Sequence, residues 1–305
     1  MSQPSAPESA LVPPLRDVDR IVELICGLTS DSPNEIRRRL KTEYSSMGTS
    51  VREALRAKSI EPHVWSEQLE RFYEQTDAFL FETIVWNLTH AKCYLRAWIG
   101  EYLRSDSEPK SILTFGDGLG FDSFYLAAAG HKVTYFEVSR PCAEFAKTIF
   151  ADHQLAVEVI VDPREIEGRK LAVIVCLDVL EHVPDPIGLV QWLSEMLKPG
   201  GKLIVSAPFF LIDQNVQTHL KSNRKFSGDY RRLFAPAGLS PVAGRLFWNP
   251  IVLQKTEANA RQSNHIPSKI RLGGLLLKLA RIWSLPFTQS NNSIVKQKYP
   301  LKFRP

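Results

Sequence analysis

The chain has 305 residues, a net charge of +5, and 44% hydrophobic and 23% charged residues, so it can form a sizeable globular core. No apolar run approaches the ~20 residues that a membrane span needs, which argues against an integral membrane protein. The four cysteines, Cys26, Cys93, Cys142 and Cys176, form no C-x-x-C pair, so we expect reduced thiols in a cytoplasmic protein, with neither disulfides nor a bound metal.

The first 107 residues divide into a lead-in and a helical region. Residues 1–15 are rich in Ser and Pro and lack the basic and apolar stretches of a signal peptide, so we expect a disordered segment. In residues 16–107, aliphatic residues recur at helical spacing, and Ser32-Pro33-Asn34-Glu35 fits a helix start. Residues 67–103 are rich in aromatic side chains, which either pack between helices or cover a substrate pocket.

Residues 108–255 alternate between short apolar strands and helices. This alternation predicts an α/β domain with a doubly wound, mostly parallel, Rossmann-like sheet, because parallel strands need crossover helices. Pro199-Gly200-Gly201 is expected to end the helix before the fifth strand. The predicted strands are 111–115, 132–137, 157–162, 171–177, 202–206, 239–248 and 251–255, and the predicted helices are 121–129, 141–153, 186–197 and 230–234.

A glycine-rich loop follows the first predicted strand. Phe115 is followed by Gly116-Asp117-Gly118-Leu119-Gly120, and glycines at alternate positions let the backbone turn sharply and approach a ligand closely. The spacing is not that of a dinucleotide-binding loop, which would need Gly or Ala where this chain has Phe121. Because glycine turns are common, the loop alone is equally consistent with a structural turn.

Acidic residues stand at the ends of the next three strands, at the edge where an open α/β sheet binds its ligand. Glu137, followed by Val138, can accept both hydroxyls of a ribose, or it is a solvated strand-end acid. Asp162 can accept from the exocyclic amine of adenine, or it forms a turn before Pro163. Asp178 ends the fourth strand and opens Asp178-Val179-Leu180-Glu181-His182. Each feature is ambiguous alone, whereas the ordered set is specific.

The ordered set resembles the class I S-adenosylmethionine-dependent methyltransferases. The segment from Asp178 to Leu203 is especially similar to the O-methyltransferases of ubiquinone biosynthesis, and the resemblance covers about residues 110–255. It implies a seven-stranded sheet whose last strand is antiparallel. The family usually has an acid two residues before its first glycine, where this chain has Thr114.

The resemblance also assigns a cofactor site. It implies that the three glycines of the loop wrap the methionine part of S-adenosylmethionine, with Phe115 and Asp117 in the same site. It implies that Glu137 holds the ribose beside Val138 and that Asp162 lies near the adenine. Asp178 would lie beside the methionine end, facing the substrate.

The implied reaction is in-line transfer of the sulfonium methyl to a small-molecule acceptor, for which a hydroxyl is the leading hypothesis. His182 is the candidate general base because imidazole titrates near neutral pH, although it could equally cap or pack under the cofactor loop. His219 is a weaker second candidate. A weakly catalytic cofactor-binding scaffold, motivated by Thr114, stays open as an alternative. So does an RNA methyltransferase, but Leu177-Asp178-Val179-Leu180 lacks the Asn/Asp-Pro-Pro-aromatic motif of amino-methylating enzymes, so a nucleic-acid partner is not favoured.

Residues 256–305 form a basic tail with no Asp or Glu after Ala258 and nine Lys or Arg residues. An amphipathic helix is predicted between Ser268 and Pro286, with Arg271, Gly274, Lys278 and Arg281 on one face and leucines on the other. This helix either docks on the domain or on a second subunit, or lies in a membrane interface, which would make the protein peripheral. The sequence does not fix the oligomeric state.

Overall fold

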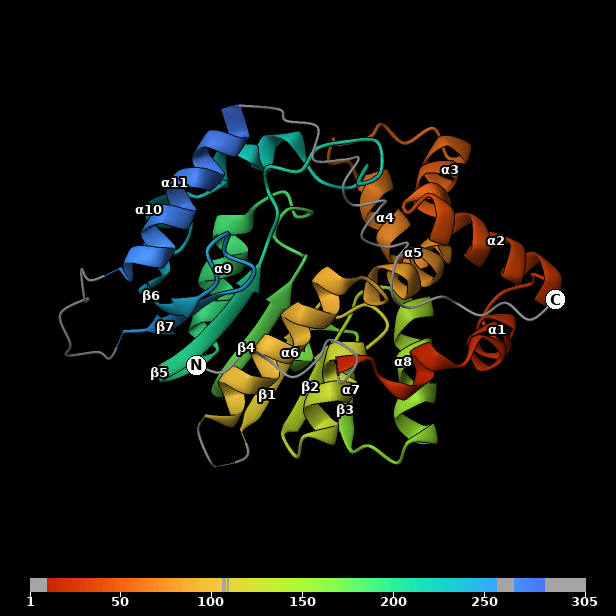
Figure 1. Ribbon diagram of the computed structural model, residues 1–305, viewed down its shortest axis with the longest axis horizontal. Coiled ribbons are helices and arrows are strands. Elements are labelled where there is room, and N and C mark those ends of the chain that lie inside the picture. The colour runs from red at the N-terminus through yellow and green to blue at the C-terminus, as the bar shows by residue number, and fades with distance from the viewer. Residues whose placement is uncertain (1–9, 106–107, 109, 257–265, 283–305) are drawn as a thin grey trace.

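The computed structural model describes residues 10–105, 108, 110–256 and 266–282. A sheet flanked by helices on both faces lies at the centre of this part of the chain (Figure 1). Among the described helices, none has the length and apolar composition needed to cross a membrane. The expected end of the predicted tail helix, with Trp283 and Pro286, lies outside the described residues.

Seven strands form one sheet within the described residues, in the order β3-β2-β1-β4-β5-β7-β6. Strands β1 to β5 are parallel, and β7 runs antiparallel to both β5 and β6. This confirms the doubly wound α/β fold with an antiparallel last strand. The strands are β1 (Ser111–Phe115), β2 (Lys132–Phe136), β3 (Val157–Ile160), β4 (Leu171–Leu177), β5 (Leu197–Ser206), β6 (Leu239–Gly244) and β7 (Ile251–Lys255).

Side chains alternate between the two faces of the sheet because successive strand residues point in opposite directions. Ile112 packs with residues of α6 and α7 on one face, and its neighbour Leu113 packs with residues of α9 on the other. Helix α8 covers β2 through Phe145, which packs in one cluster with Tyr135. The helices that cover the faces are α6 (His90–Arg104), α7 (Phe121–Ala128), α8 (Arg140–Asp152), α9 (Pro186–Glu195), α10 (Tyr230–Leu233) and α11 (Ser268–Ile282).

The N-terminal helices form a cap beside the carboxyl ends of the strands (Figure 1). Ser32 begins α2 as predicted, with its hydroxyl accepting a hydrogen bond from the Glu35 amide at 3.3 Å. Side chains of α3 and α4 share an apolar cluster with Leu220, a residue of the loop that follows β5. The cap helices are α1 (Val18–Cys26), α2 (Pro33–Ser45), α3 (Thr49–Ala57), α4 (Glu67–Gln75) and α5 (Ala78–Asn87).

Three details differ from the sequence predictions. The lead-in expected to be disordered through residue 15 is ordered from Ala10, because Leu11, Val12 and Leu15 are buried against the cap. Strand β5 begins at Leu197, so Pro199-Gly200-Gly201 lies inside the strand beside a register shift opposite β4 rather than ending a helix. Strand β6 ends at Gly244, four residues earlier than predicted.

Candidate functional site

The carboxyl ends of β1, β2 and β4 open into a cavity of about 760 Å³ between the sheet and the cap. Its walls come from the glycine loop, the ends of these strands, helices α4 and α5, and the loop after β5. The aromatic residues of 67–103 serve both of their expected roles: Phe72 and Phe81 are core residues, whereas Tyr73, Phe79 and Trp86 line the cavity. We call the part of the cavity over the glycine loop the cofactor half and the part under the cap the acceptor half, after the roles that the sequence analysis predicts for them.

The glycine loop places its backbone against the cavity. Gly116 and Gly118 both line the cavity and have left-handed backbones, with φ of +69° and +57°. A Cβ on Gly116 would lie 2.6 Å from Val179 Cγ2, so a side chain does not fit there without displacement. Gly120, which is not among the cavity-lining residues, caps α7 and packs on Phe150 of α8.

Glu137 lies at the end of β2 with its carboxylate buried in the cavity wall. Its Oε2 accepts a hydrogen bond from the Gly118 amide at 2.8 Å, and its Oε1 accepts one from the Ser139 amide at 2.9 Å. Burial raises the pKa of this carboxyl, and the amide hydrogen bonds counteract the rise. The carboxylate is therefore held in place by the loop that would carry the cofactor.

Val138 and Asp162, which are both predicted to bind the cofactor, lie in different settings. Val138 lines the cavity and also an adjacent, shallower recess of about 420 Å³. Phe115 and Trp192 line this recess as well. Asp162 lines neither the cavity nor the recess. Its side chain is 32% exposed, and its carboxylate pairs with the Arg164 guanidinium at 2.5 Å, which lowers the Asp162 pKa to about 2.

Thr114, which stands where the family usually has an acid, points into the core. Its hydroxyl lies 2.6 Å from that of Ser123 in α7. Asp117 accepts hydrogen bonds from the Ser123 amide at 2.7 Å and the Ser123 hydroxyl at 2.5 Å. Burial and the nearby Asp122 raise the Asp117 pKa to about 7. Asp117 therefore supplies the acidic group of the loop while tied to the start of α7.

A buried ionic network under the loop was not predicted. The Lys92 ammonium lies 2.9 Å from an Asp122 oxygen and 3.6 Å from Asp178 Oδ2, and Asp122 also pairs with Arg96 at 2.7 Å. Asp178 further accepts a hydrogen bond from the Trp86 indole at 3.1 Å and has a left-handed backbone, with φ of +58°. The network joins the cap to the end of β4, and no sequence spacing connects residues so far apart.

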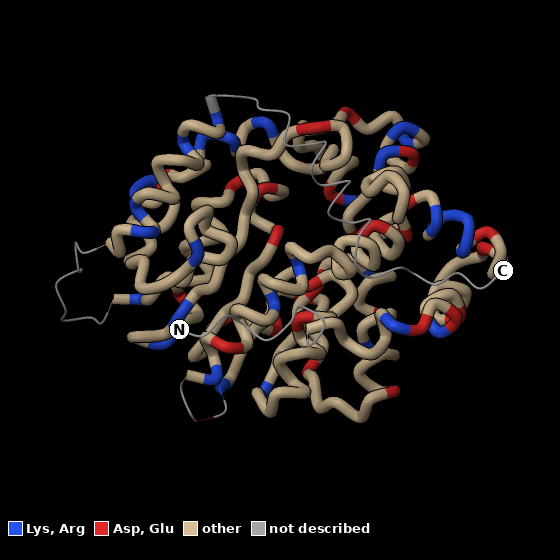
Figure 2. Tube along the Cα trace, viewed as in Figure 1, with Lys and Arg blue, Asp and Glu red and all other residues tan. Residues whose placement is uncertain are grey.

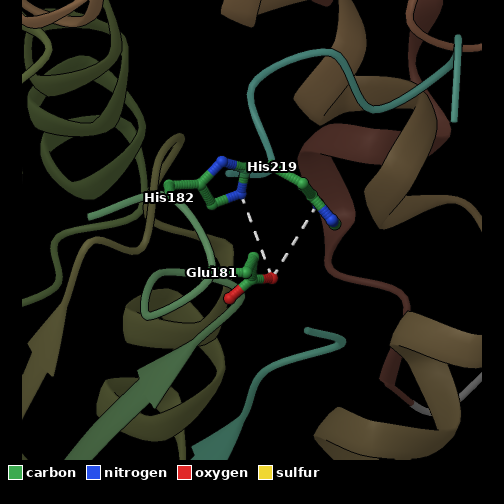
Figure 3. Close-up of side chains that lie close together, drawn as sticks. All are labelled: Glu181, His182 and His219. Atoms are coloured by element: carbon green, nitrogen blue, oxygen red, sulfur yellow. Dashed lines mark ion pairs between the residues drawn. The ribbon is translucent and has the colours of Figure 1, made fainter. Parts of the chain in front are cut away.

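Three side chains meet in the acceptor half, as Figure 3 shows. Glu181 and His182 follow β4, and His219 comes from the loop after β5. The Nε2 atoms of His182 and His219 lie 3.9 and 4.0 Å from the same Glu181 oxygen, Oε1. The two imidazole rings are nearly perpendicular, with centroids 4.6 Å apart. The sequence pointed to both histidines, and the structure adds Glu181.

Glu181 and His219 of this group are buried, and the His182 side chain is 20% exposed. Both Glu181 oxygens are without a hydrogen-bond partner among the described residues. Burial and the nearby Asp178 raise the pKa of Glu181 well above its usual range, whereas burial lowers the pKa of His182 to about 4. The pKa of His219 is also well below normal because of burial and the adjacent His182. Both imidazoles are therefore neutral at physiological pH, and the Glu181 carboxyl favours its protonated form.

Hydrogen bonds to the Nδ1 atoms fix the ring orientations. His219 Nδ1 lies 2.8 Å from the Leu211 carbonyl oxygen, which can only accept, so Nδ1 carries the proton and Nε2 presents a lone pair toward Glu181. His182 Nδ1 lies 3.0 Å from the Tyr73 hydroxyl. The carboxyl and two imidazoles offer one ligand atom each, all within 4.8 Å of one another, which fits a divalent cation. The expectation of no metal site overlooked this group.

The cap holds the loop that carries His219. The His63 amide donates to the Gln217 carbonyl at 2.7 Å, and the Lys221 amide donates to the His63 carbonyl at 3.1 Å. The His63 ring Nδ1 lies 2.9 Å from the His219 carbonyl oxygen. His63 therefore fastens the loop on both sides of His219, a role that its sequence context did not indicate.

Comparison with known proteins identifies the family of this chain. Residues 88–240 match the model of the methyltransferase domain, and this range includes the glycine loop and the three strand-end acids described above. The chain belongs to the class I S-adenosylmethionine-dependent methyltransferases. This methyltransferase therefore uses S-adenosylmethionine as its cofactor, and the cavity walls fit that ligand through the glycine loop and Glu137.

The relatives of this methyltransferase include bacterial ubiquinone biosynthesis O-methyltransferases. That of Pseudomonas aeruginosa is 32% identical over 131 residues, 40% of this chain and 52% of the relative. That of Pseudomonas entomophila is 28% identical over 198 residues, 57% of this chain and 83% of the relative. The chain thus spans about half the length of the first of these relatives.

A solved methyltransferase structure also resembles this chain. The 1,6-didemethyltoxoflavin-N1-methyltransferase of Burkholderia thailandensis, with bound 1,6-didemethyltoxoflavin and S-adenosylhomocysteine, is 20% identical. The match covers 63% of this chain and 87% of that structure, with a TM-score of 0.45.

Proposed function

We propose that this methyltransferase methylates a hydroxyl group on a small, flat, apolar acceptor. The observation that carries this proposal is the Glu181–His182–His219 group, because an acceptor hydroxyl would supply the partner that the two Glu181 oxygens lack among the described residues. The imidazoles are neutral and can accept the hydroxyl proton, and Glu181 can exchange a proton with them. Names of the ubiquinone biosynthesis relatives support oxygen methylation.

The walls of the acceptor half support an aromatic body for the acceptor. Tyr73 stacks on Phe79 with ring centroids 5.2 Å apart, and Trp65 stacks on Tyr73 at 6.5 Å. All three rings line the cavity. Flat apolar walls favour a ring that lies parallel to them, with its hydroxyl directed at the polar group.

In this proposal the residues of the chain align the acceptor, exclude water and hold its proton. S-adenosylmethionine supplies the electrophilic methyl group, and a divalent cation bound to Glu181, His182 and His219 would lower the pKa of an acceptor hydroxyl. Without a cation, His182 is a weak general base, since its low pKa leaves little affinity for the proton. Asp178, which follows β4, joins this strand end to the Trp86 indole and the Lys92 ammonium.

The test compares acceptor classes. The protein is incubated with S-adenosylmethionine labelled in its methyl group and with catechols, phenols, the matching anilines, or RNA. We expect label in the phenolic or catecholic products, and a Glu181→Gln variant that loses most of this transfer. Label in the anilines or in RNA, with none in the hydroxyl acceptors, would contradict the proposal.

A separate measurement addresses the cation. The protein is dialysed against a chelator and assayed after addition of Mg²⁺, Mn²⁺ or Zn²⁺. Activity that is lost and then restored by one ion supports cation-assisted transfer. Activity that survives chelation leaves His182 and His219 as the groups that accept the proton.

A further inference from the structure

Helix α11 presents an apolar stripe to solvent although it is docked on the domain. Leu272, Leu275 and Leu279 are 51%, 56% and 48% exposed. At about 100° per residue these three leucines span only about 60° around the helix, so they form one narrow ridge. A ridge of three half-exposed leucines on a single helix face needs an explanation that lone surface leucines do not.

The opposite face of α11 packs against the domain. Ile270 and Leu277 are buried, and Gly273 lies so close to Leu246 that a Cβ would clash with its carbonyl oxygen. The Ser227 hydroxyl donates to the Leu277 carbonyl at 3.0 Å. The predicted docking of the helix is therefore present. The predicted division of faces was wrong, because Gly274 packs inward while the exposed leucines point outward.

Basic residues flank the leucine ridge on both sides. Arg271 and Lys278 lie about 80–100° around the helix from the buried Ile270, and Lys269 lies on the other flank. All three are exposed. Figure 2 shows Lys and Arg residues spaced along α11, whose sequence has no Asp or Glu. Between residues 214 and 282 the sequence has twelve Lys or Arg and only two acids, Asp229 and Glu257.

We infer that the exposed face of α11 docks on an anionic membrane surface, with Leu272, Leu275 and Leu279 entering the interface and the flanking Lys and Arg contacting lipid headgroups. An apolar ridge bordered by cations is the composition of a helix that lies in the plane of such an interface. The charge pattern favours an anionic lipid surface over a second copy of this chain, because two α11 faces would bring like charges together.

The same helix is joined to the cavity. The Trp248 indole donates to the Ile270 carbonyl at 2.9 Å, and Trp248 also lines the cavity together with Phe247, which is 56% exposed. The loop between β6 and β7 thus lies against α11 and against the active-site cavity. A membrane bound to α11 holds this side of the cavity near the lipid, which suits an acceptor that resides there.

The test is co-sedimentation of the full chain with vesicles of phosphatidylglycerol and phosphatidylcholine, or of phosphatidylcholine alone. We expect binding to the anionic vesicles at low salt that weakens as salt rises. The variant Leu272→Ser/Leu275→Ser/Leu279→Ser should lower the affinity at least about tenfold, since it removes the apolar insertion. Val64→Ser/Val161→Ser, which changes exposed apolar residues elsewhere, should bind like the wild type.

Charge variants separate the electrostatic contribution to vesicle binding from the apolar contribution. Arg271→Glu/Lys278→Glu should weaken binding to anionic vesicles more than Lys41→Glu/Lys147→Glu, which changes the net charge equally at exposed sites away from α11. Melting temperatures near that of the wild type show that each variant is folded. Wild-type protein that does not bind the anionic vesicles, or a leucine variant that binds as the wild type does, overturns the inference. So does a concentration-dependent dimer that only the leucine variant abolishes, because the ridge would then join two copies of the chain.

Discussion

Glu137 and Glu181 are both buried carboxyl groups that follow strands of the sheet, yet their surroundings differ. Glu137, in the cofactor half, accepts hydrogen bonds from two backbone amides, whereas both oxygens of Glu181, in the acceptor half, lack a partner among the described residues. An unpaired buried polar group costs about 1–3 kcal/mol. The cofactor half is therefore organised before its ligand arrives, and the acceptor half retains groups that a ligand would satisfy.

Substitutions in the two halves of the cavity test this comparison, and the largest effect is expected at His182. His182→Ala should lower turnover about 10²- to 10⁴-fold while leaving S-adenosylhomocysteine affinity nearly unchanged, because the ring faces the acceptor half. Methyl-transfer rates and calorimetric titration measure the two quantities. His153→Ala, at an exposed position, is the control. Loss of cofactor affinity in proportion to turnover would instead indicate that His182 supports the cofactor loop.

The opposite is expected at Glu137, where a substitution should weaken cofactor binding. Glu137→Ala should weaken S-adenosylhomocysteine binding by about 2–4 kcal/mol, because the carboxylate is predicted to accept two charge-assisted hydrogen bonds from the ribose hydroxyls. The carboxylate also holds the Gly118 amide, so the melting temperature is measured in parallel. Glu144→Ala on the exposed side of α8 is the matched control. Unchanged affinity would remove Glu137 from the cofactor site.

A third carboxyl, Glu82, allows the free-energy cost of an unpaired acid to be measured from the pH dependence of stability. Burial and the nearby Glu43 raise its pKa to about 8, and one of its oxygens has no hydrogen-bond partner in the part of the chain that the structure describes. The folded protein therefore binds a proton that the unfolded chain releases above about pH 4.5, so this group's contribution to stability falls as pH rises to about 8.

Glu82→Gln should remove that pH dependence. The melting temperature of the variant should exceed that of the wild type by an amount that grows from pH 5 to pH 8, by the equivalent of about 1.4 kcal/mol per pH unit, and then levels off. Glu74→Gln, at an exposed position on α4, controls for the lost charge. A difference that does not vary with pH would contradict the raised pKa.

The smallest effect is expected at Asp162, on the cofactor side but outside the cavity. Asp162→Ala should change S-adenosylhomocysteine affinity by no more than about threefold, because a partly exposed acid paired with Arg164 contributes little. Titration against the Glu137→Ala variant gives the scale. A loss as large as that at Glu137 would show that Asp162 leaves Arg164 to bind the adenine.

The sequence predicted the sheet well because buried parallel strands are short apolar runs between helices. Glu137 and Asp162 show where such reasoning ends: both follow strands, but only the fold distinguishes the carboxylate that turns into the cavity from the one that turns to solvent. The Lys92–Asp122–Asp178 network had no local signal, since its members lie on three separate elements. Glu181 did carry a signal, because it stands beside His182 and three residues after Asp178.

The hydrogen bonds of His63 bear on how the enzyme opens. His63 fastens the loop that carries His219, and the same loop closes the acceptor half under the cap. Any displacement of the cap that pulls on His63 therefore also pulls His219 from Glu181. If the proposed acceptor enters by displacement of the cap, its entry and the assembly of the Glu181–His182–His219 group would be one event.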